Sequence, residues 1–354
     1  MGAMLPDAKN VEAGLRRRLA MHGIQPRPKR KGELHIFLAY PLTNWEAVLP
    51  VALSPFGRVT TFEWRSRGYD DRAKDWVEHR DAMNLALLDA FEQTNRLQPV
   101  DAFVGYLSGR NTARATLEAV EKSGAVIFNF CWDDRLNFPG RKVGGRYSSP
   151  AEIATAVDLN LTNAPNSIAQ YAVHGGIAMF WPLAADPRIH RPYDRAFEFD
   201  VSFVGQKYGR RPLFISALRR MGIPVVTFGE GWGNGPLSNE EMVELYSRTR
   251  VNLGFSGVQY CRNLKVLHGR DFEVPMSGGL YLTEGHADLH LVYDVGKEIV
   301  TYRDVRDCAM KITWLLGHPA EAAEIRSAGH ARACRDHTWE ARFDHIFRLS
   351  GLLE

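Results

Sequence analysis

The chain has 354 residues, of which 45% are hydrophobic and 24% charged, and its formal net charge at pH 7 is +3. The length predicts two domains, and the composition is typical of a soluble globular protein. A charge of +3 is too small to make nucleic acid or a membrane the main partner.

The cysteines argue against a disulfide framework or a zinc site. Cys131, Cys261, Cys308 and Cys334 lie far apart and form no CxxC pair, so we expect a cytoplasmic location. No clear DxD carboxylate pair follows a strand either, so we expect no metal site. No apolar run approaches the ~20 residues that span a bilayer, so we predict no transmembrane segment.

Residues 1–33 are polar and basic, with arginines at 16–18 and basic residues at 29–31. We expect a short helix over 11–21, ended by Pro26 and Pro28. The segment is predicted as a basic leader outside the domains. It is either solvated or in peripheral contact with anionic lipid or an acidic acceptor.

Residues 34–182 predict a first α/β domain. Apolar runs at 34–39, 59–64, 101–105, 125–130, 157–161 and 177–181 are the expected strands. A long helix between the second and third carries Trp76, Met83, Leu87 and Phe91 on one face. Strands that are apolar throughout and alternate with helices are typical of a parallel sheet covered on both faces.

Residues 183–199 are rich in Pro, Arg and Asp and predict an interdomain linker. The α/β pattern then restarts over 200–337, with strands expected at 200–204, 225–228, 251–255 and 298–302. The end of the chain, 338–354, is expected to be a helix that could pack back on the first domain. The fold class is therefore α/β, with two successive domains.

Ligands of open parallel α/β sheets bind outside the carboxyl ends of the strands. One loop at such a position, 205–211, contains Gly205, Lys207, Arg210 and Arg211 ahead of a helix that Pro212 opens. Its positive charges and the helix dipole would suit a diphosphate, although an exposed basic loop is an equal alternative. The chain has no GxxxxGK[ST] loop and no GxGxxG after the first strand, which argues against a P-loop protein or a dehydrogenase.

Candidate bases lie at other strand and helix ends. Asp133 and Asp134 follow the fourth strand, where like charges and partial burial would raise one pKa. They could equally cap the next helical turn or pair with Arg135 and Arg141. His174 is a second candidate base, with a structural role as its alternative, and His268 has the same two interpretations.

A charged stretch leads into a glycine turn at 270–279. We expect Glu273 to lie just ahead of a strand that starts at Leu280, near the mouth of a cleft. It would be either a solvated charge or a ligand contact. Gly278 and Gly279 would let the backbone pass close to a bound nucleotide.

From Asp200 onward the chain resembles the CgeB-like glycosyltransferases, a bacterial group related to the large class with two Rossmann-like lobes, the GT-B fold. The matching pieces are, in chain order, Phe203-Val204-Gly205 with Arg210-Arg211, Lys265 with Arg270-x-Phe272-Glu273-x-Pro275-x-x-Gly278-Gly279, Glu298-Ile299-Val300-x-Tyr302, and His337-Thr338-Trp339-x-x-Arg342.

The resemblance implies two parallel sheets facing across a cleft, with the nucleotide-sugar on the second domain and the acceptor on the first. Glu273 matches a glutamate that holds ribose hydroxyls in related retaining enzymes. Those relatives often carry a second glutamate eight positions earlier, where this chain has Lys265. The stereochemical outcome therefore does not carry over, and Lys265 and Arg270 would suit the diphosphate.

We therefore predict a metal-independent glycosyltransferase that needs no cofactor and takes a nucleotide-sugar, with a UDP-sugar as first choice. The acceptor is a glycan, protein or small molecule. The predicted donor-site residues are Gly205, Lys207, Arg210, Arg211, Gly229, Trp232, Lys265, Arg270, Glu273, Gly278 and Gly279, with Gly229 to Trp232 around the nucleobase. Asp133, Asp134 and His174 are the candidate catalytic residues. The alternatives are a nucleotide-sugar epimerase or hydrolase on the same fold, and a binding protein without catalysis.

Overall fold

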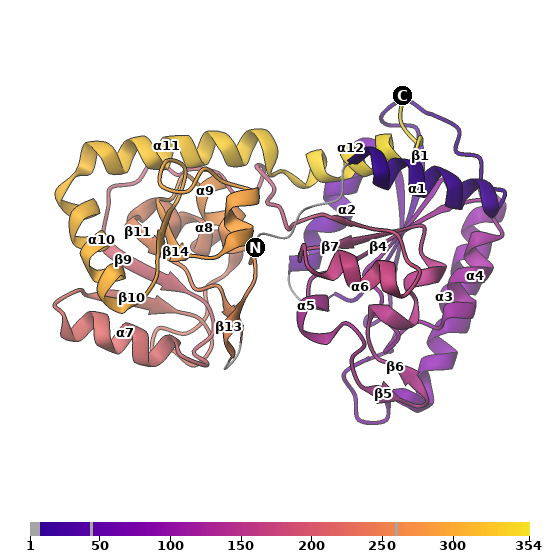
Figure 1. Ribbon diagram of the computed structural model, residues 1–354, viewed down its shortest axis with the longest axis horizontal. Coiled ribbons are helices and arrows are strands. Elements are labelled where there is room, and N and C mark those ends of the chain that lie inside the picture. Colours follow the sequence, from indigo (N-terminus) through magenta and orange to yellow (C-terminus); the bar gives the residue numbers. More distant parts are fainter. Residues whose placement is uncertain (1–7, 43–44, 259–260) are drawn as a thin grey trace. The chain divides into compact units, whose positions relative to one another are not determined.

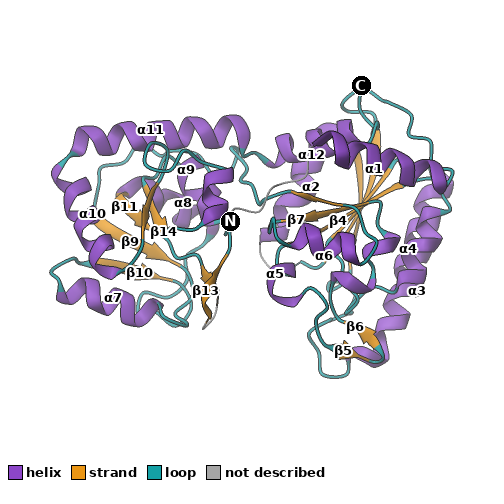
Figure 2. Ribbon diagram, in the orientation of Figure 1, coloured by secondary structure: helices purple, strands orange, loops and turns teal. Residues whose placement is uncertain are grey.

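The computed structural model describes residues 8–42, 45–258 and 261–354. The chain forms two compact units, which are residues 1–182 together with 340–354, and residues 183–339. Figure 1 labels their elements in chain order, and Figure 2 separates the strands from the helices that cover them. No described helix combines the length and the apolar character that crossing a membrane requires.

Within the described residues, the first unit has a parallel sheet of six strands in the order β2-β1-β3-β4-β7-β8. These strands are β1 Leu34–Tyr40, β2 Gly57–Glu63, β3 Ala102–Gly105, β4 Val126–Cys131, β7 Leu159–Thr162 and β8 Ala178–Phe180. The helices are α1 Ala8–Met21, α2 Val48–Leu53, α3 Trp76–Leu97, α4 Arg114–Glu121, α5 Asp134–Asn137, α6 Ser167–Val173 and α12 Trp339–Leu349. A small antiparallel pair, β5 Lys142–Val143 and β6 Arg146–Tyr147, completes the unit.

Both faces of this sheet are covered, as the apolar strands predict. All seven residues of β1 are buried. The predicted face of α3 packs on one side, where Phe91 contacts Phe37 and Phe103 edge-on. On the other side Phe347 of α12 packs against Phe128, so the last helix completes the first unit.

Residues 8–33 are part of the first unit, so the prediction of a solvated leader is wrong for them. Val11, Leu15 and Leu19 of α1 are buried. Arg18 is buried too, because its Nε donates to Asp158 Oδ1 at 2.8 Å and its Nη2 to Glu121 Oε1 at 2.9 Å. Arg18 therefore fastens α1 to the unit through its ion pairs, whereas Arg16 pairs with Glu12 within the same helix.

The second unit has a parallel sheet of five strands among the described residues, in the order β10-β9-β11-β14-β15. Its strands are β9 Phe199–Val204, β10 Val225–Phe228, β11 Thr249–Leu253, β14 Tyr281–Glu284 and β15 Val300–Tyr302, with the antiparallel pair β12 Gly257–Val258 and β13 Cys261–Lys265. Its helices are α7 Arg211–Arg220, α8 Asn239–Arg248, α9 Arg270–Met276, α10 Val305–Gly317 and α11 Pro319–Asp336. Short 3-10 helices in the two units span Trp45–Ala47, Ser54–Phe56, Pro150–Glu152, Ala154–Ala156 and Ala287–Leu291.

The strand order of the second sheet places a topological switch point between β9 and β11. The chain moves outward from β9 to β10, then returns and continues on the other side through β11 and β14. Loops that leave neighbouring strands in opposite directions open a crevice at their carboxyl ends, where ligands of such sheets bind. The loops after β9 and β11 therefore border the place where a ligand is expected.

Candidate functional site in the second unit

Two arginines meet at the switch point. Arg211 begins α7 after the β9 loop, and Arg270 begins α9. Both rest on Phe203 of β9, with guanidinium carbons 5.5 Å and 5.8 Å from its ring centroid. Arg211 is buried and Arg270 is half-buried.

Neither cation forms a direct ion pair within the described residues, although, against the effect of burial, the nearby tyrosines and the carboxylates of Glu273 and Asp271 raise the pKa of Arg270. Among the described residues, neither guanidinium has a carboxylate at ion-pairing distance; Arg211 donates to Gln206 O at 3.0 Å, and the buried Nε of Arg270 has no hydrogen-bond partner. Burial, with Arg270 nearby, lowers the pKa of Arg211 to about 10, so it stays charged at neutral pH. Unpaired charge in a poorly hydrated place is costly, and a bound anion would remove that cost.

The glycine loop after β9 makes room for Arg270. A Cβ on Gly205 would lie 3.2 Å from Arg270 Nη1, and a Cβ on Gly229 would lie 2.4 Å from Gly205 O. Both glycines have positive φ, which L side chains rarely adopt. Gly205 and Gly229 therefore let the β9 and β10 loops pack together under the arginine.

His268 lies beside the arginines and is uncharged. Burial, reinforced by the neighbouring Arg270 and Arg211, lowers its pKa to about 3, and its Nε2 has no partner among the described residues. Its backbone N–H donates to Asp271 Oδ2 at 2.7 Å. A neutral imidazole can offer this site one hydrogen bond but no charge.

The other predicted cations lie apart from this pair. Lys207 is exposed, and its Nζ lies 5.5 Å from the ring centroid of Trp232. The indole N–H of Trp232 donates to Gly205 O at 2.8 Å, so Trp232 pins the β9 loop. Arg210 is exposed and approaches Glu284, with Nη1 3.8 Å from Oε1.

Lys265 and Glu273 differ from their expected surroundings. Lys265 Nζ donates to Gly285 O at 2.8 Å and lies 3.3 Å from Glu284 Oε1. Glu273 lies within α9 and not just ahead of a strand, because the helix extends to Met276. Its Oε1 would be 2.6 Å from a Cβ on Gly269, so the carboxylate turns back toward the first turn of the helix.

The prediction that Gly278 and Gly279 lie next to a bound nucleotide is wrong. They follow α9 and precede β14, so they lie at the amino end of that strand, away from the ligand edge. A Cβ on Gly278 would meet Pro192 at 3.0 Å, and one on Gly279 would meet Val274 at 2.8 Å. Close packing explains these glycines, and the expected approach of a nucleotide to them does not fit this placement.

In the first unit, the candidate bases have unlike surroundings. Asp134 is fully buried and accepts a hydrogen bond from Ser167 Oγ at 3.1 Å, and burial raises its pKa to about 6. Asp133 is exposed and precedes α5. His174 is also exposed and follows the last residue of α6, about 10 Å along the helix from Ser167. The structure therefore does not bring His174 to the aspartates.

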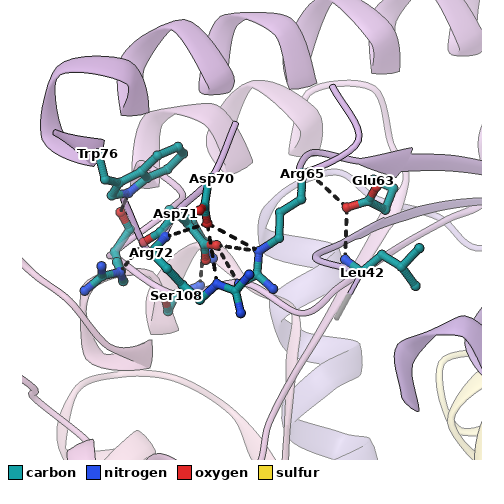
Figure 3. A network of polar contacts seen from close by, with 10 residues as sticks. Leu42, Glu63, Arg65, Asp70, Asp71, Arg72, Trp76 and Ser108 are labelled. Atoms are coloured by element: carbon teal, nitrogen blue, oxygen red, sulfur yellow. Dashed lines mark hydrogen bonds and ion pairs between the residues drawn. The ribbon is translucent and has the colours of Figure 1, made fainter. Parts of the chain in front are cut away.

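The loops at the carboxyl ends of β1 and β2 are fastened by the network in Figure 3. Glu63 accepts backbone N–H groups of Leu42, Arg65 and Ser66 at 2.9, 2.9 and 2.8 Å. Arg65 donates from Nε and Nη2 to Asp71 Oδ1 at 2.8 and 2.6 Å. These bonds stabilise one conformation of the loops at this edge.

Among the described residues, no group of three or more His, Cys, Asp or Glu side chains is arranged to hold a metal ion.

The sequence patterns had singled out cations for this site but not Glu284, Asp271 or Tyr281. The sequence signal for Glu284 was a single acidic residue that ends an apolar strand and precedes a glycine.

One family model matches part of this chain. Residues 210–348 match a family model described as glycosyl transferase-like. This segment is a glycosyl transferase-like region. It contains Arg211, Lys265, Arg270 and Glu273, as well as Glu284. No curated protein matches the sequence.

Solved glycosyltransferase structures share the fold over 89–90% of this chain. Sucrose-phosphate synthase from Thermosynechococcus elongatus is 12% identical, with a TM-score of 0.61 over 90% of this chain and 98% of that one. A glycosyltransferase from Rickettsia africae is 8% identical, with a TM-score of 0.62 over 90% and 98%. Anabaena HepE in complex with UDP-glucose is 10% identical, with a TM-score of 0.55 over 89% and 99%. The fold is therefore GT-B, and the glycosyl transferase-like region coincides with most of the second unit.

Proposed function

We propose that this protein is a glycosyltransferase of the CgeB-like group. It moves a sugar from a nucleotide-diphosphate sugar, a UDP-sugar as first choice, to an acceptor hydroxyl. The observation that carries the proposal is the pair Arg211 and Arg270 at the switch point, within the segment that matches the glycosyl transferase-like model. Among the described residues, neither guanidinium forms a direct ion pair with a carboxylate, and the buried Nε of Arg270 has no hydrogen-bond partner. HepE, which shares the fold, is solved with UDP-glucose.

The two guanidiniums suit a leaving nucleoside diphosphate. Breaking the bond between the sugar and the diphosphate places a full negative charge on the leaving oxygen, and fixed cations stabilise that charge as it develops. Because both side chains are held by packing on Phe203, little reorganisation is needed when the donor binds. We therefore propose that these protein cations neutralise the diphosphate without a metal ion.

We assign the remaining roles by the type of side chain and the unit that carries it. Glu273 would accept hydrogen bonds from the ribose hydroxyls, and the region of Gly229 to Trp232 would surround the base. On the first unit, Asp133 is the more accessible carboxylate for taking the proton of an acceptor hydroxyl, since Asp134 is fully buried. We expect Asp133→Asn to lower kcat with little change in the affinity for donor.

Titration calorimetry with UDP-, GDP- and dTDP-sugars tests the proposal directly, in the presence and absence of EDTA. We expect one class of nucleotide-sugar to bind, and EDTA to leave its affinity unchanged. If none of them binds, the proposal is wrong. If the bound donor is consumed at full rate without any acceptor, the protein is an epimerase or hydrolase instead of a glycosyltransferase. If the donor binds but is never consumed, the protein is a binding protein without catalysis.

A further inference from the structure

A pocket in the second unit adjoins the pair Arg211 and Arg270. Arg211 is shared between the pair and the pocket, since it stacks on Phe203 and also lines the pocket, together with Arg210. The pocket combines three aromatic side chains with two arginines and one carboxylate. Its lining is Tyr208, Arg210, Arg211, Phe214, Phe255, Gly257, Cys261 and Glu284. The carboxylate is unexpected in a place that otherwise attracts anions.

Glu284 is held firmly in place. It ends β14, and its backbone carbonyl accepts a hydrogen bond from Ser256 Oγ at 2.9 Å. The side chain is only 9% exposed, and its Oε1 lies 3.3 Å from Lys265 Nζ and 3.8 Å from Arg210 Nη1. Lys265 is itself anchored by its bond to Gly285 O. The two cations therefore fix the orientation of the carboxylate.

The second carboxylate oxygen is oriented differently. Among the described residues, both ion pairs of Glu284 use Oε1, whereas Oε2 lies 3.4 Å from where a Cβ on Gly257 would be. Gly257 also lines the pocket, so its missing side chain leaves space next to this oxygen. An ionised carboxylate only accepts hydrogen bonds, with about two lone-pair positions on each oxygen. Oε2 is thus suited to a group that carries O–H donors.

A sugar fits these surroundings better than a second phosphate. A phosphate would be repelled by the carboxylate, but sugar hydroxyls donate hydrogen bonds to it. Sugar rings also present C–H faces, which can pack on the aromatic side chains of Tyr208, Phe214 and Phe255. The pocket therefore has both kinds of contact that a hydroxylated ring requires.

The strand order supports the same assignment. β10, β9, β11 and β14 lie in that order, with the predicted base region after β10, the arginine pair at β9 and β11, and Glu284 at the end of β14. A nucleotide-sugar carries base, diphosphate and sugar in the corresponding sequence. Laid along this edge with its base at β10, the donor would bring its sugar to β14.

We propose that Glu284 is a specificity-determining residue that accepts hydrogen bonds from hydroxyls of the transferred sugar, and that Lys265 is the residue that positions it. This inference rests on the proposed function and adds a defined sugar subsite to it. It also changes the expected role of Lys265, from a diphosphate contact to the support of a carboxylate.

The test is calorimetric binding of UDP, UDP-glucose, UDP-galactose and UDP-N-acetylglucosamine to wild type, Glu284→Gln and Glu284→Asp. Wild type should bind one of the UDP-sugars more tightly than UDP. Glu284→Gln should leave UDP affinity within about twofold but weaken that UDP-sugar about ten- to a hundredfold, the range for loss of a charged hydrogen bond. Glu284→Asp, which keeps the charge one methylene further back, should fall between the two. Glu244→Gln is the matched control, because Glu244 also pairs with an arginine but lies on α8; it should bind like wild type.

Monodeoxy analogues of the preferred UDP-sugar identify the hydroxyl. At least one analogue should bind wild type more weakly than the parent sugar, whereas Glu284→Gln should bind both equally. Lys265→Met should reduce this discrimination, and Lys265→Arg should restore it. A thermal unfolding midpoint close to wild type shows that the variants are folded.

The outcomes separate this inference from the proposed function. If wild type binds no nucleotide, the proposed function fails and the subsite fails with it. If UDP binds but no UDP-sugar binds more tightly, or if Glu284→Gln weakens UDP and the UDP-sugar equally, only the subsite is overturned. Unchanged affinity of Glu284→Gln for every ligand also overturns it.

Discussion

The hydroxyl of Tyr281 donates a hydrogen bond to Oδ1 of Asp271 at 2.8 Å, and both side chains are buried. Burial raises the pKa of Asp271 to about 6, while this hydrogen bond acts to lower it. The pair connects the start of α9, which carries Arg270, to β14, which carries Glu284. This buried hydrogen bond therefore links the two elements that carry Arg270 and Glu284.

Tyr281→Phe should destabilise the protein by about 1–3 kcal/mol, because a buried acceptor loses its donor. It should also raise the pKa of Asp271 further. A carboxyl whose folded pKa is raised stabilises the fold at low pH, and this stabilisation is lost as pH rises through the folded pKa. The destabilisation should therefore be larger at pH 8 than at pH 5 in denaturant unfolding. Tyr246→Phe is the control, since the buried Tyr246 hydroxyl has no partner among the described residues. Equal losses in the two variants would contradict this account.

Arg211→Met should weaken UDP binding about ten- to a hundredfold, because a charged hydrogen-bond donor to the diphosphate is removed. The ligand-free protein should lose little stability. Relief of repulsion from Arg270 offsets the lost stacking on aromatic rings, which is worth about 0.5–2 kcal/mol. Calorimetry and thermal unfolding with and without UDP measure both effects. Arg220→Met, which changes an exposed arginine at the other end of α7, should alter neither. A large loss of ligand-free stability would instead assign Arg211 a structural role.

Asp134→Asn should change the pH dependence of stability. Between about pH 4 and pH 6 the folded wild type keeps the proton of Asp134 while the unfolded chain has lost it, so wild-type stability falls as pH rises. The variant lacks this loss, and its stability relative to wild type should increase by roughly 3 kcal/mol from pH 4 to pH 7. Urea unfolding at several pH values measures the difference. A difference that does not vary with pH would show that the folded pKa of Asp134 is not raised. Asp133→Asn should show a variation of the same sign, because burial also raises the pKa of Asp133.

Arg18→Met should destabilise the first unit by about 3–5 kcal/mol, because Asp158 would be left buried without its partner. Arg17→Met changes the neighbouring arginine, which is exposed, and should have little effect. Chemical unfolding, together with proteolysis of the segment before residue 34, compares the two variants. Similar behaviour of both would mean that the run acts through its overall charge.

Periodicity and apolar runs predicted most of the architecture, because buried parallel strands and one-sided helices leave direct patterns in sequence. The face of α3 and the strand Val225–Phe228 are examples. Long-range pairing has no such pattern. The partners of Arg18 are 103 and 140 residues away, so a basic run resembled a solvated leader.

The candidate site has the same limit, because loop position in the sequence selects residues but does not show which of them pair. Loop position at strand ends selected Gly205, Arg211 and Arg270, which the structure brings together. Charge type could not show that Lys207 lies against Trp232 or that Lys265 pairs with Glu284. Gly278 and Gly279 were correctly expected just ahead of the strand at Leu280 but were assigned to the ligand edge, because the sequence did not show that α9, from Arg270 to Met276, separates them from that edge.

The return of the chain to its first unit limits how the protein can be divided. Residues 183–339 form one uninterrupted segment, whereas the first unit consists of 1–182 and 340–354. A stop after residue 182 would remove Phe347 from its contact with Phe128 and expose apolar surface on the sheet. Expression of the first unit alone therefore needs a short linker that joins residue 182 to residue 340. The second unit can be expressed as the continuous segment 183–339.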